Sequence, residues 1–112
     1  MFIVDSTLSR KDLLQKCEVK MEDDMIKGVA DLGSKRIALD APLHVDLETL
    51  LLQEGADQND LWGFNLYPDE DEEFIEFDSM INIRPWQNNR SRGVENEETQ
   101  EEIKEVISKW IK

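Results

Sequence analysis

The chain has 112 residues, the length of one ordinary domain, and 39% of them are hydrophobic, which is enough for a core. Its 26 acidic residues against 13 Lys and Arg give a formal net charge of −13, which excludes duplex nucleic acid as a partner because that affinity requires cations to neutralise phosphates. The only cysteine, Cys17, excludes an intramolecular disulfide, and no run approaches the roughly 18 apolar residues of a membrane span, so we expect one cytoplasmic domain over residues 1–112 without a membrane partner.

The N-terminal segment predicts a short strand followed by a helix. Phe2-Ile3-Val4 is an apolar run with the length of an edge strand. Ser9 is followed three residues later by Asp12, as in a capping box, and Leu8 and Leu13 have the spacing of a hydrophobic staple. We therefore expect a helix that begins after Ser9 and ends before the next acidic run.

The middle of the chain predicts a β-hairpin and a second helix. Residues 25–31 and 36–40 flank a turn in which Gly33 makes a positive φ inexpensive. Asp46 is expected to cap a short leucine-rich helix, and Gly55 is expected to end it.

Two longer strands are expected in the second half of the chain. Apolar and polar side chains alternate in LWGFNLY (residues 61–67) and in FIEFDSMINIR (residues 74–84), where only Ser79 interrupts the pattern. This period of two is typical of antiparallel strands with one buried face. The apolar positions, which we expect to face the core, are Trp62, Phe64 and Leu66 in the first strand and Ile75, Phe77, Ile81 and Ile83 in the second.

The C-terminal segment has the spacing of an amphipathic helix. Its apolar residues recur at i, i+3, i+4, i+7 and i+8, Asn96 precedes it as a cap, and lysines lie toward its end. The stripe consists of Ile103, Val106, Ile107, Trp110 and Ile111. Together, the elements predict an α+β fold, a single small domain with a mostly antiparallel sheet of about four strands and helices on one face.

The alternation in the last two strands also predicts a row of polar side chains. If the apolar residues of 74–84 face the core, the intervening residues share the opposite face of the sheet. That row consists of Glu76, Asp78, Asn82 and Arg84, joined by Asn65 and Tyr67 from the neighbouring strand.

The loop that follows this row, RPWQNNRSRG (residues 84–93), is cationic in an acidic protein. No acidic residue occurs between Asp78 and Glu95, and the interval holds three of the five arginines. In an extended backbone Arg90 and Arg92 point the same way, roughly 6.5–7 Å apart. Two guanidinium forks at that spacing suit a carboxylate or phosphate, and the small residues beside them leave backbone amides open to an anion.

These features predict a binding domain for a small anionic ligand or an acidic peptide. The expected ligand-binding residues are Arg84, Arg90, Arg92, Asn65, Tyr67, Asp78 and Asn82. An alternative is that the same arginines pair with Glu76 and Asp78 and make the loop purely structural.

Two further function classes stay open. One is a small enzyme acting on a phosphorylated or carboxylated metabolite, with Asp78 or the only histidine, His44, as base. The other is a homodimerising or partner-docking module in which the arginine loop is structural. We expect no metal, because His44 has no second His or Cys nearby, and no cofactor, because a Gly-rich phosphate loop is missing.

Two long stretches resemble a small family of bacterial and archaeal proteins of unknown function. They are HVDLETLLLQEGADQNDLWGFNLYP and IEFDSMINIRPWQNNRSRGVEN, and the likeness covers the chain from about Met25 onward. The family often has Ser-Gln-Gly where this chain has Trp86-Gln87-Asn88, so stacking of a ligand on Trp86 would be particular to this protein. The resemblance implies a small cytosolic domain and supplies no activity, ligand or catalytic residue.

Overall fold

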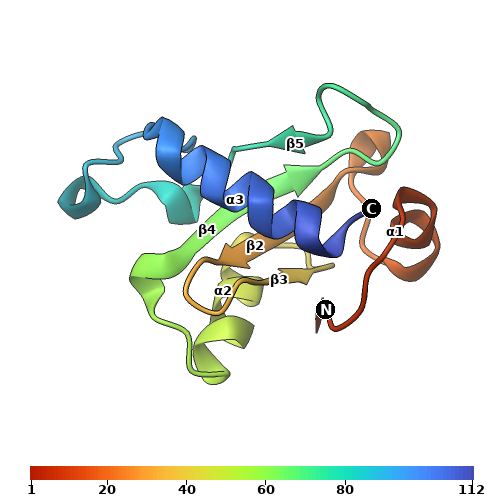
Figure 1. Ribbon diagram of the computed structural model, residues 1–112, viewed down its shortest axis with the longest axis horizontal. Helices are drawn as coiled ribbons and strands as arrows, with labels where there is room; N and C mark the ends of the chain where they lie inside the picture. The colour runs from red at the N-terminus through yellow and green to blue at the C-terminus, as the bar shows by residue number, and fades with distance from the viewer.

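The computed structural model describes all 112 residues. The fold contains five antiparallel strands and three α-helices (Figure 1). The strands are β1 (Phe2–Ile3), β2 (Ile26–Asp31), β3 (Arg36–Leu39), β4 (Leu61–Leu66) and β5 (Ile75–Glu76), in the order β1-β3-β2-β4-β5. The helices are α1 (Arg10–Lys16), α2 (His44–Gln53) and α3 (Glu97–Trp110). The predicted α+β fold with an antiparallel sheet is confirmed, with one strand more than expected.

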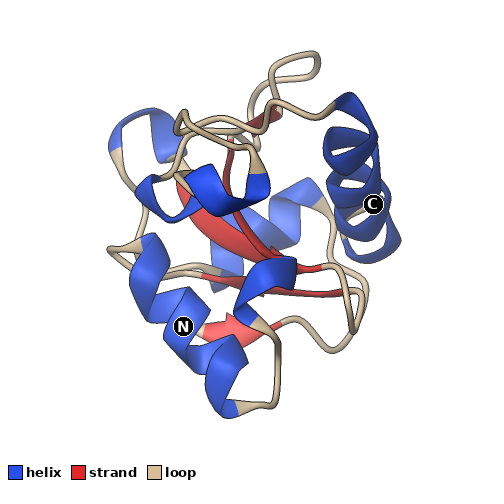
Figure 2. Ribbon diagram, turned by 90° about the vertical axis from the view of Figure 1, so that its left-hand side faces the viewer, coloured by secondary structure: helices blue, strands red, loops and turns tan.

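The helices lie on both faces of the sheet, so the expectation that they share one face is wrong. The larger core contains α1 and α3, and α3 crosses the front of the sheet in Figure 1. A second core packs Leu47 and Leu51 of α2 against Val29, Ala38 and Leu61. Figure 2 shows the strands between helices on either side. Every residue of β4 is buried, so this strand needs cover on both faces.

The helix ends follow local chemistry with one exception. Ser9 and Asp12 form the predicted capping box of α1, and Asn96 accepts the Thr99 N–H at the start of α3. Asp46, in contrast, does not cap α2; the helix begins two residues earlier, and its N-cap position is occupied by Leu43, which has no side-chain acceptor.

The sequence predicts a positive φ angle at Gly33 and at Gly55, and the prediction for Gly33 is wrong. Gly55 follows the last residues of α2 with φ 94°, as expected for a residue that ends a helix. In the β2–β3 turn the left-handed residue is Lys35 (φ 57°) and not Gly33.

Most of the predicted strand 74–84 is not a strand. β5 pairs with β4 only through Glu76 and Ile75, after which the chain forms a 3₁₀ turn over Met80–Asn82. The Asn82 side chain takes the place of a strand backbone, because its Oδ1 accepts the Gly63 N–H (2.8 Å) and its Nδ2 donates to the Gly63 carbonyl (3.0 Å). The edge of β4 is thereby satisfied without further strand pairing.

Close packing at Gly63 fixes where this turn lies. A Cβ atom built on Gly63 would lie 2.5 Å from the Ser79 side chain, so only glycine lets Ser79 lie against β4. Ser79 is buried there and accepts the Ile81 N–H at the start of the turn, as a structural hydroxyl does. No helix of the protein combines the length and the apolar character needed to cross a bilayer.

Candidate functional site

Arg84, which the sequence predicts as a ligand-binding residue, is buried inside the protein. Its side chain is 2% exposed and donates to the carbonyl oxygens of Ile81 (3.0 Å) and Leu61 and to the Gln87 side chain (3.3 Å). Glu48 of α2 lies 3.7 Å from the guanidinium. Burial lowers the pKa of Arg84, and the Glu48 carboxylate opposes that shift.

Asn82, another predicted ligand-binding residue, is also buried, as is Asn89, and the side chains of both form hydrogen bonds within the protein. Besides its bonds to Gly63, Asn82 donates to the Arg92 carbonyl (3.0 Å). Asn89 contacts the carbonyls of Asn82 (2.7 Å) and Gly93 (2.8 Å), and its oxygen accepts the Glu95 N–H (2.8 Å). Asn82 thereby ties the Arg92 end of the loop to β4, and Asn89 closes the loop through contacts within it.

The backbone amides expected to receive a ligand anion are occupied by Glu95. Its carboxylate accepts the N–H groups of Arg90 and Ser91, the latter at 3.0 Å. These bonds lower the pKa of Glu95, since they favour the charged form. The Gly93 N–H donates to the Ser91 hydroxyl (3.2 Å). The Glu95 carboxylate is therefore the anion that binds these loop amides.

The two remaining arginines do not converge on one point. Arg92 lies with its Nε 2.6 Å from Asp78 Oδ1, an ion pair in which both side chains are about half exposed. The Arg90 side chain is exposed and forms no ion pair. Trp86, at 69% exposed, projects from the loop and does not line the pocket described next.

Four of the predicted site residues meet in one cavity of about 360 Å³, here called the α2 pocket. It lies between the start of α2, the end of β4 and the segment from Glu76 to Ile81. The predicted residues that line it are Asn65, Tyr67, Asp78 and Arg92, while Arg84, Arg90 and Asn82 do not. His44, Lys27, Glu76 and Ser79 complete its polar lining.

Asn65 forms the most constrained part of this lining. The residue is 3% exposed, and its Nδ2 donates to Glu76 Oε1 (2.9 Å) and to the Asp78 carbonyl (3.3 Å). Two acceptors on the nitrogen fix the orientation of the amide. As a result the buried Oδ1 has no hydrogen-bond partner, although buried polar atoms in folded proteins almost always have one.

His44, which begins α2, contributes an imidazole to the same pocket. Its Nε2 lies 2.8 Å from the Phe64 carbonyl, so a neutral ring carries its proton on Nε2 and its lone pair on Nδ1. Burial lowers the pKa of His44, and Lys27 lowers it further, whereas the Phe64 carbonyl, Asn65 and Asp78 raise it. The net shift is downward, and the ring is neutral at pH 7.

The rim of the pocket is apolar and exposed, which the sequence did not predict. Leu43 is 54% exposed, Val45 47% and Met80 66%, and all three line the pocket. They are three of only six large apolar side chains that the fold leaves exposed. The sequence signal was the pair of apolar residues around His44, at positions that face away from the core side of α2.

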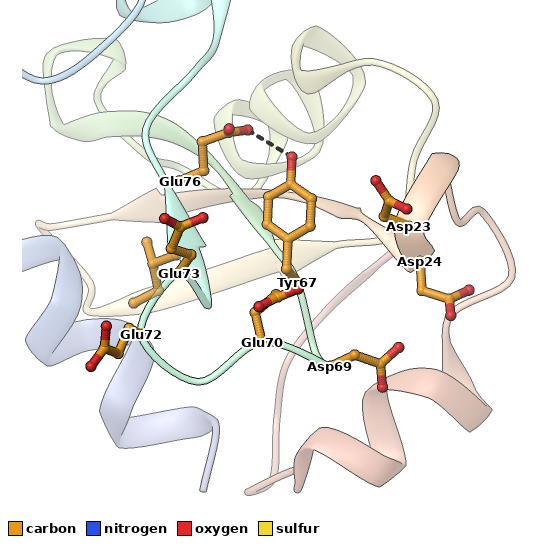
Figure 3. Close-up of a pocket in the computed structure, with 9 residues that line it drawn as sticks. Asp23, Asp24, Tyr67, Asp69, Glu70, Glu72, Glu73 and Glu76 are labelled. Carbon is orange, nitrogen blue, oxygen red and sulfur yellow. Dashed lines mark hydrogen bonds between the residues drawn. The ribbon is translucent and has the colours of Figure 1, made fainter.

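A second concavity, the acidic hollow, adjoins the α2 pocket and shares Tyr67 and Glu76 with it (Figure 3). Its volume is about 820 Å³, and Tyr67 lies at its centre with its hydroxyl 3.0 Å from Glu76 Oε1. Burial, reinforced by Glu76, raises the pKa of Tyr67 to about 12, so the phenol keeps its proton. The hollow is also lined by Ile75 and by seven acids: Asp23, Asp24, Asp69, Glu70, Glu72, Glu73 and Glu76.

None of these seven carboxylates forms an ion pair. No group of three or more His, Cys, Asp or Glu side chains is arranged to hold a metal ion.

The chain belongs to a family described as "Protein of unknown function (DUF5674)", whose model matches residues 2–110. The match includes residues 2–24, which the sequence resemblance does not cover. No curated protein matches the chain, and no solved structure does either.

Proposed function

We propose that this protein is a partner-binding module and that the α2 pocket is its binding site. One observation carries the proposal. Three exposed apolar side chains surround a pocket whose buried floor contains an unsatisfied Asn65 oxygen. Apolar rims around a few convergent polar groups are typical of binding sites, and a buried acceptor without a donor is costly unless a ligand supplies one.

In this proposal the Arg84–Arg92 loop supports the site and does not itself recognise a ligand. The Ser79 N–H donates to the Arg92 carbonyl (2.9 Å), and Asn82 joins the same carbonyl to Gly63. These bonds hold the segment from Asp78 to Ile81, which forms one wall of the α2 pocket, against β4.

The contacts favour this reading over capture of a small anion or an acidic peptide. Of the two cations at the pocket, Arg92 is bonded to Asp78, and Lys27 shares the lining with Glu76 without forming an ion pair. A small anion would gain little net attraction there, because its cationic partners are already opposed by two carboxylates.

The enzyme alternative has less support. His44 and Asp78, the two residues considered as bases, do line the same pocket. However, Asp78 is engaged by Arg92, and the His44 Nε2 is engaged by the Phe64 carbonyl. Neither residue lies next to a nucleophile that is free to react, since Ser79 is buried against Gly63.

Small organic probes test the binding site without knowledge of the partner. Titration of ¹⁵N-labelled protein with 2-propanol and acetamide should shift the backbone amide signals of His44, Val45 and Asn65 selectively. Met80→Ser should reduce these shifts, because it removes one side of the apolar rim. Leu52→Ser is the matched control: Leu52 is also an exposed apolar residue but does not line the pocket. Probe shifts spread evenly over the surface, or equal effects of the two variants, would refute the proposal.

A further inference from the structure

The α2 pocket is one part of a longer groove that runs along Tyr67. A third concavity of about 460 Å³ shares Met25, Lys27 and Tyr67 with the pocket. Tyr67 lines all three concavities. We call the α2 pocket, the acidic hollow and this third concavity together the Tyr67 groove.

The apolar lining of the groove is rich in methionine. Three of the four methionines of the chain, Met21, Met25 and Met80, line it, together with Leu43 and Val45. Methionine side chains are unbranched and polarizable, so a surface built from them adapts to different apolar partners. Met25 also holds the centre of the groove, since its sulfur lies 3.3 Å from the Tyr67 hydroxyl.

The charges of the groove determine which kind of partner fits it. Its acidic hollow has seven carboxylates without a paired cation, while Lys27 is the only lysine and Arg92 the only arginine in the groove. The whole chain adds a net charge of −13 to this field. Such a surface attracts cations over several ångströms and repels acidic segments.

The Asn65 oxygen without a hydrogen-bond partner fits any peptide partner, and the sign of the partner's charge follows from the acidic hollow alone. A carbonyl oxygen accepts hydrogen bonds and donates none, so it must be satisfied by an N–H or O–H group. Backbone amides, Lys and Arg all offer N–H donors, whereas carboxylates offer none at neutral pH.

We propose that the Tyr67 groove binds a basic amphipathic segment of a protein partner, with an apolar side chain in the α2 pocket and Lys or Arg side chains over the acidic hollow. This inference rests on the proposed function and adds the chemistry of the partner to it. Amphipathic segments bind such grooves through apolar anchors on one side and charges on the other.

Two synthetic peptides test the sign of the charge. One is an amphipathic peptide of Leu and Lys, and the other has the same Leu positions with Glu in place of Lys. Titration calorimetry should detect binding of the Lys peptide, weakened by added salt, and no binding of the Glu peptide. Tighter binding of the Glu peptide would overturn the inference.

Two charge variants separate a specific groove from general attraction to an acidic protein. Asp69→Asn/Glu72→Gln/Glu73→Gln removes three charges from the hollow, and Glu98→Gln/Glu102→Gln/Glu105→Gln removes three exposed charges of α3 outside the groove. The first variant should weaken binding of the Lys peptide about tenfold and the second less than about twofold. Equal losses would overturn the inference, because they would mean that only the net charge matters.

The apolar anchor needs its own control. Met80→Ser should weaken binding of the Lys peptide more than Leu52→Ser does. Spermine, a cation without apolar side chains, should bind the protein more weakly than the Lys peptide. If the peptide fails to bind while 2-propanol still occupies the α2 pocket, the inference is wrong and the proposed function stands. If 2-propanol does not occupy the pocket either, the proposed function itself has failed.

Discussion

Replacing Arg84 with methionine tests most sharply whether the Arg84–Arg92 loop is structural. Methionine keeps an unbranched apolar stem but removes the guanidinium. The carbonyl oxygens of Leu61 and Ile81 would lose their donor, and Glu48, whose side chain is 10% exposed, would lose its counter-charge. A ligand-binding arginine would behave differently, since its loss changes affinity and leaves stability nearly unchanged.

The expected cost follows from the burial of this pair. Removing one partner of a buried ion pair costs about 3–5 kcal/mol, because the other charge stays behind without compensation. The total stability of a domain is about 5–15 kcal/mol, so Arg84→Met should forfeit a large share of it. At roughly 4 °C per kcal/mol for a domain of this length, the midpoint of thermal unfolding should fall by about 12–20 °C.

Urea and thermal unfolding followed by far-UV circular dichroism measure this loss. Arg90→Met is the matched control, because the Arg90 side chain is exposed and unpaired, and it should change stability by less than about 0.5 kcal/mol. The double variant Arg84→Met/Glu48→Gln should recover part of the loss by removing the stranded charge. If Arg84→Met is as stable as Arg90→Met, the loop is not a structural clasp.

Individual contacts elsewhere in the fold give further predictions. Glu95 has a pKa lowered by the Arg90 and Ser91 N–H groups, so its contribution to stability is present above about pH 4.5 and is lost as the pH falls through its folded value. Urea unfolding at a series of pH values should therefore show a smaller loss toward acid for Glu95→Gln than for the wild type. Leu43 occupies the N-cap of α2 without an acceptor, so Leu43→Ser should exceed Leu43→Ala in thermal stability by about 0.5–2 kcal/mol, and equal stabilities would contradict this helix start. Burial raises the pKa of Cys17 to about 11, so an aromatic disulfide reagent should modify it only as fast as the protein unfolds, and rapid labelling of the native protein would show that the thiol is accessible.

Local signals in the sequence predicted the elements that depend on near neighbours. The capping box at Ser9, the Asn96 cap and the apolar stripe of α3 need only residues a few positions apart, and all three are confirmed. The face of the sheet on which α2 packs could not be predicted in this way, because it depends on β4 being buried on both faces. Alternation of Trp62, Phe64 and Leu66 suggested one buried face, and the burial of Leu61 and Gly63 on the other face depends on partners distant in sequence.

The structure brings together only part of the predicted set of residues, for a similar reason. Asn65 and Glu76 are register partners, so strand alternation was enough to bring them together in the α2 pocket. Beyond Glu76 the prediction failed, because the Asn82 side chain replaces backbone pairing at Gly63. An amide side chain that forms the hydrogen bonds of a neighbouring strand leaves no periodic pattern in the sequence. The burial of Arg84 could not be predicted, because composition alone cannot tell a guanidinium that binds carbonyl oxygens inside the protein from one that faces solvent.

The acid-free interval from Asp78 to Glu95 now has a physical explanation in its two boundary residues. Asp78 binds Arg92 at one end, and Glu95 accepts the loop amides of Arg90 and Ser91 at the other. A further carboxylate between them would compete for the same donors, and in a chain of net charge −13 it would also add repulsion beside the acidic hollow. One carboxylate at each end of the interval therefore holds the loop closed. This leaves the seven unpaired acids beside Tyr67 as the charged surface available to a partner.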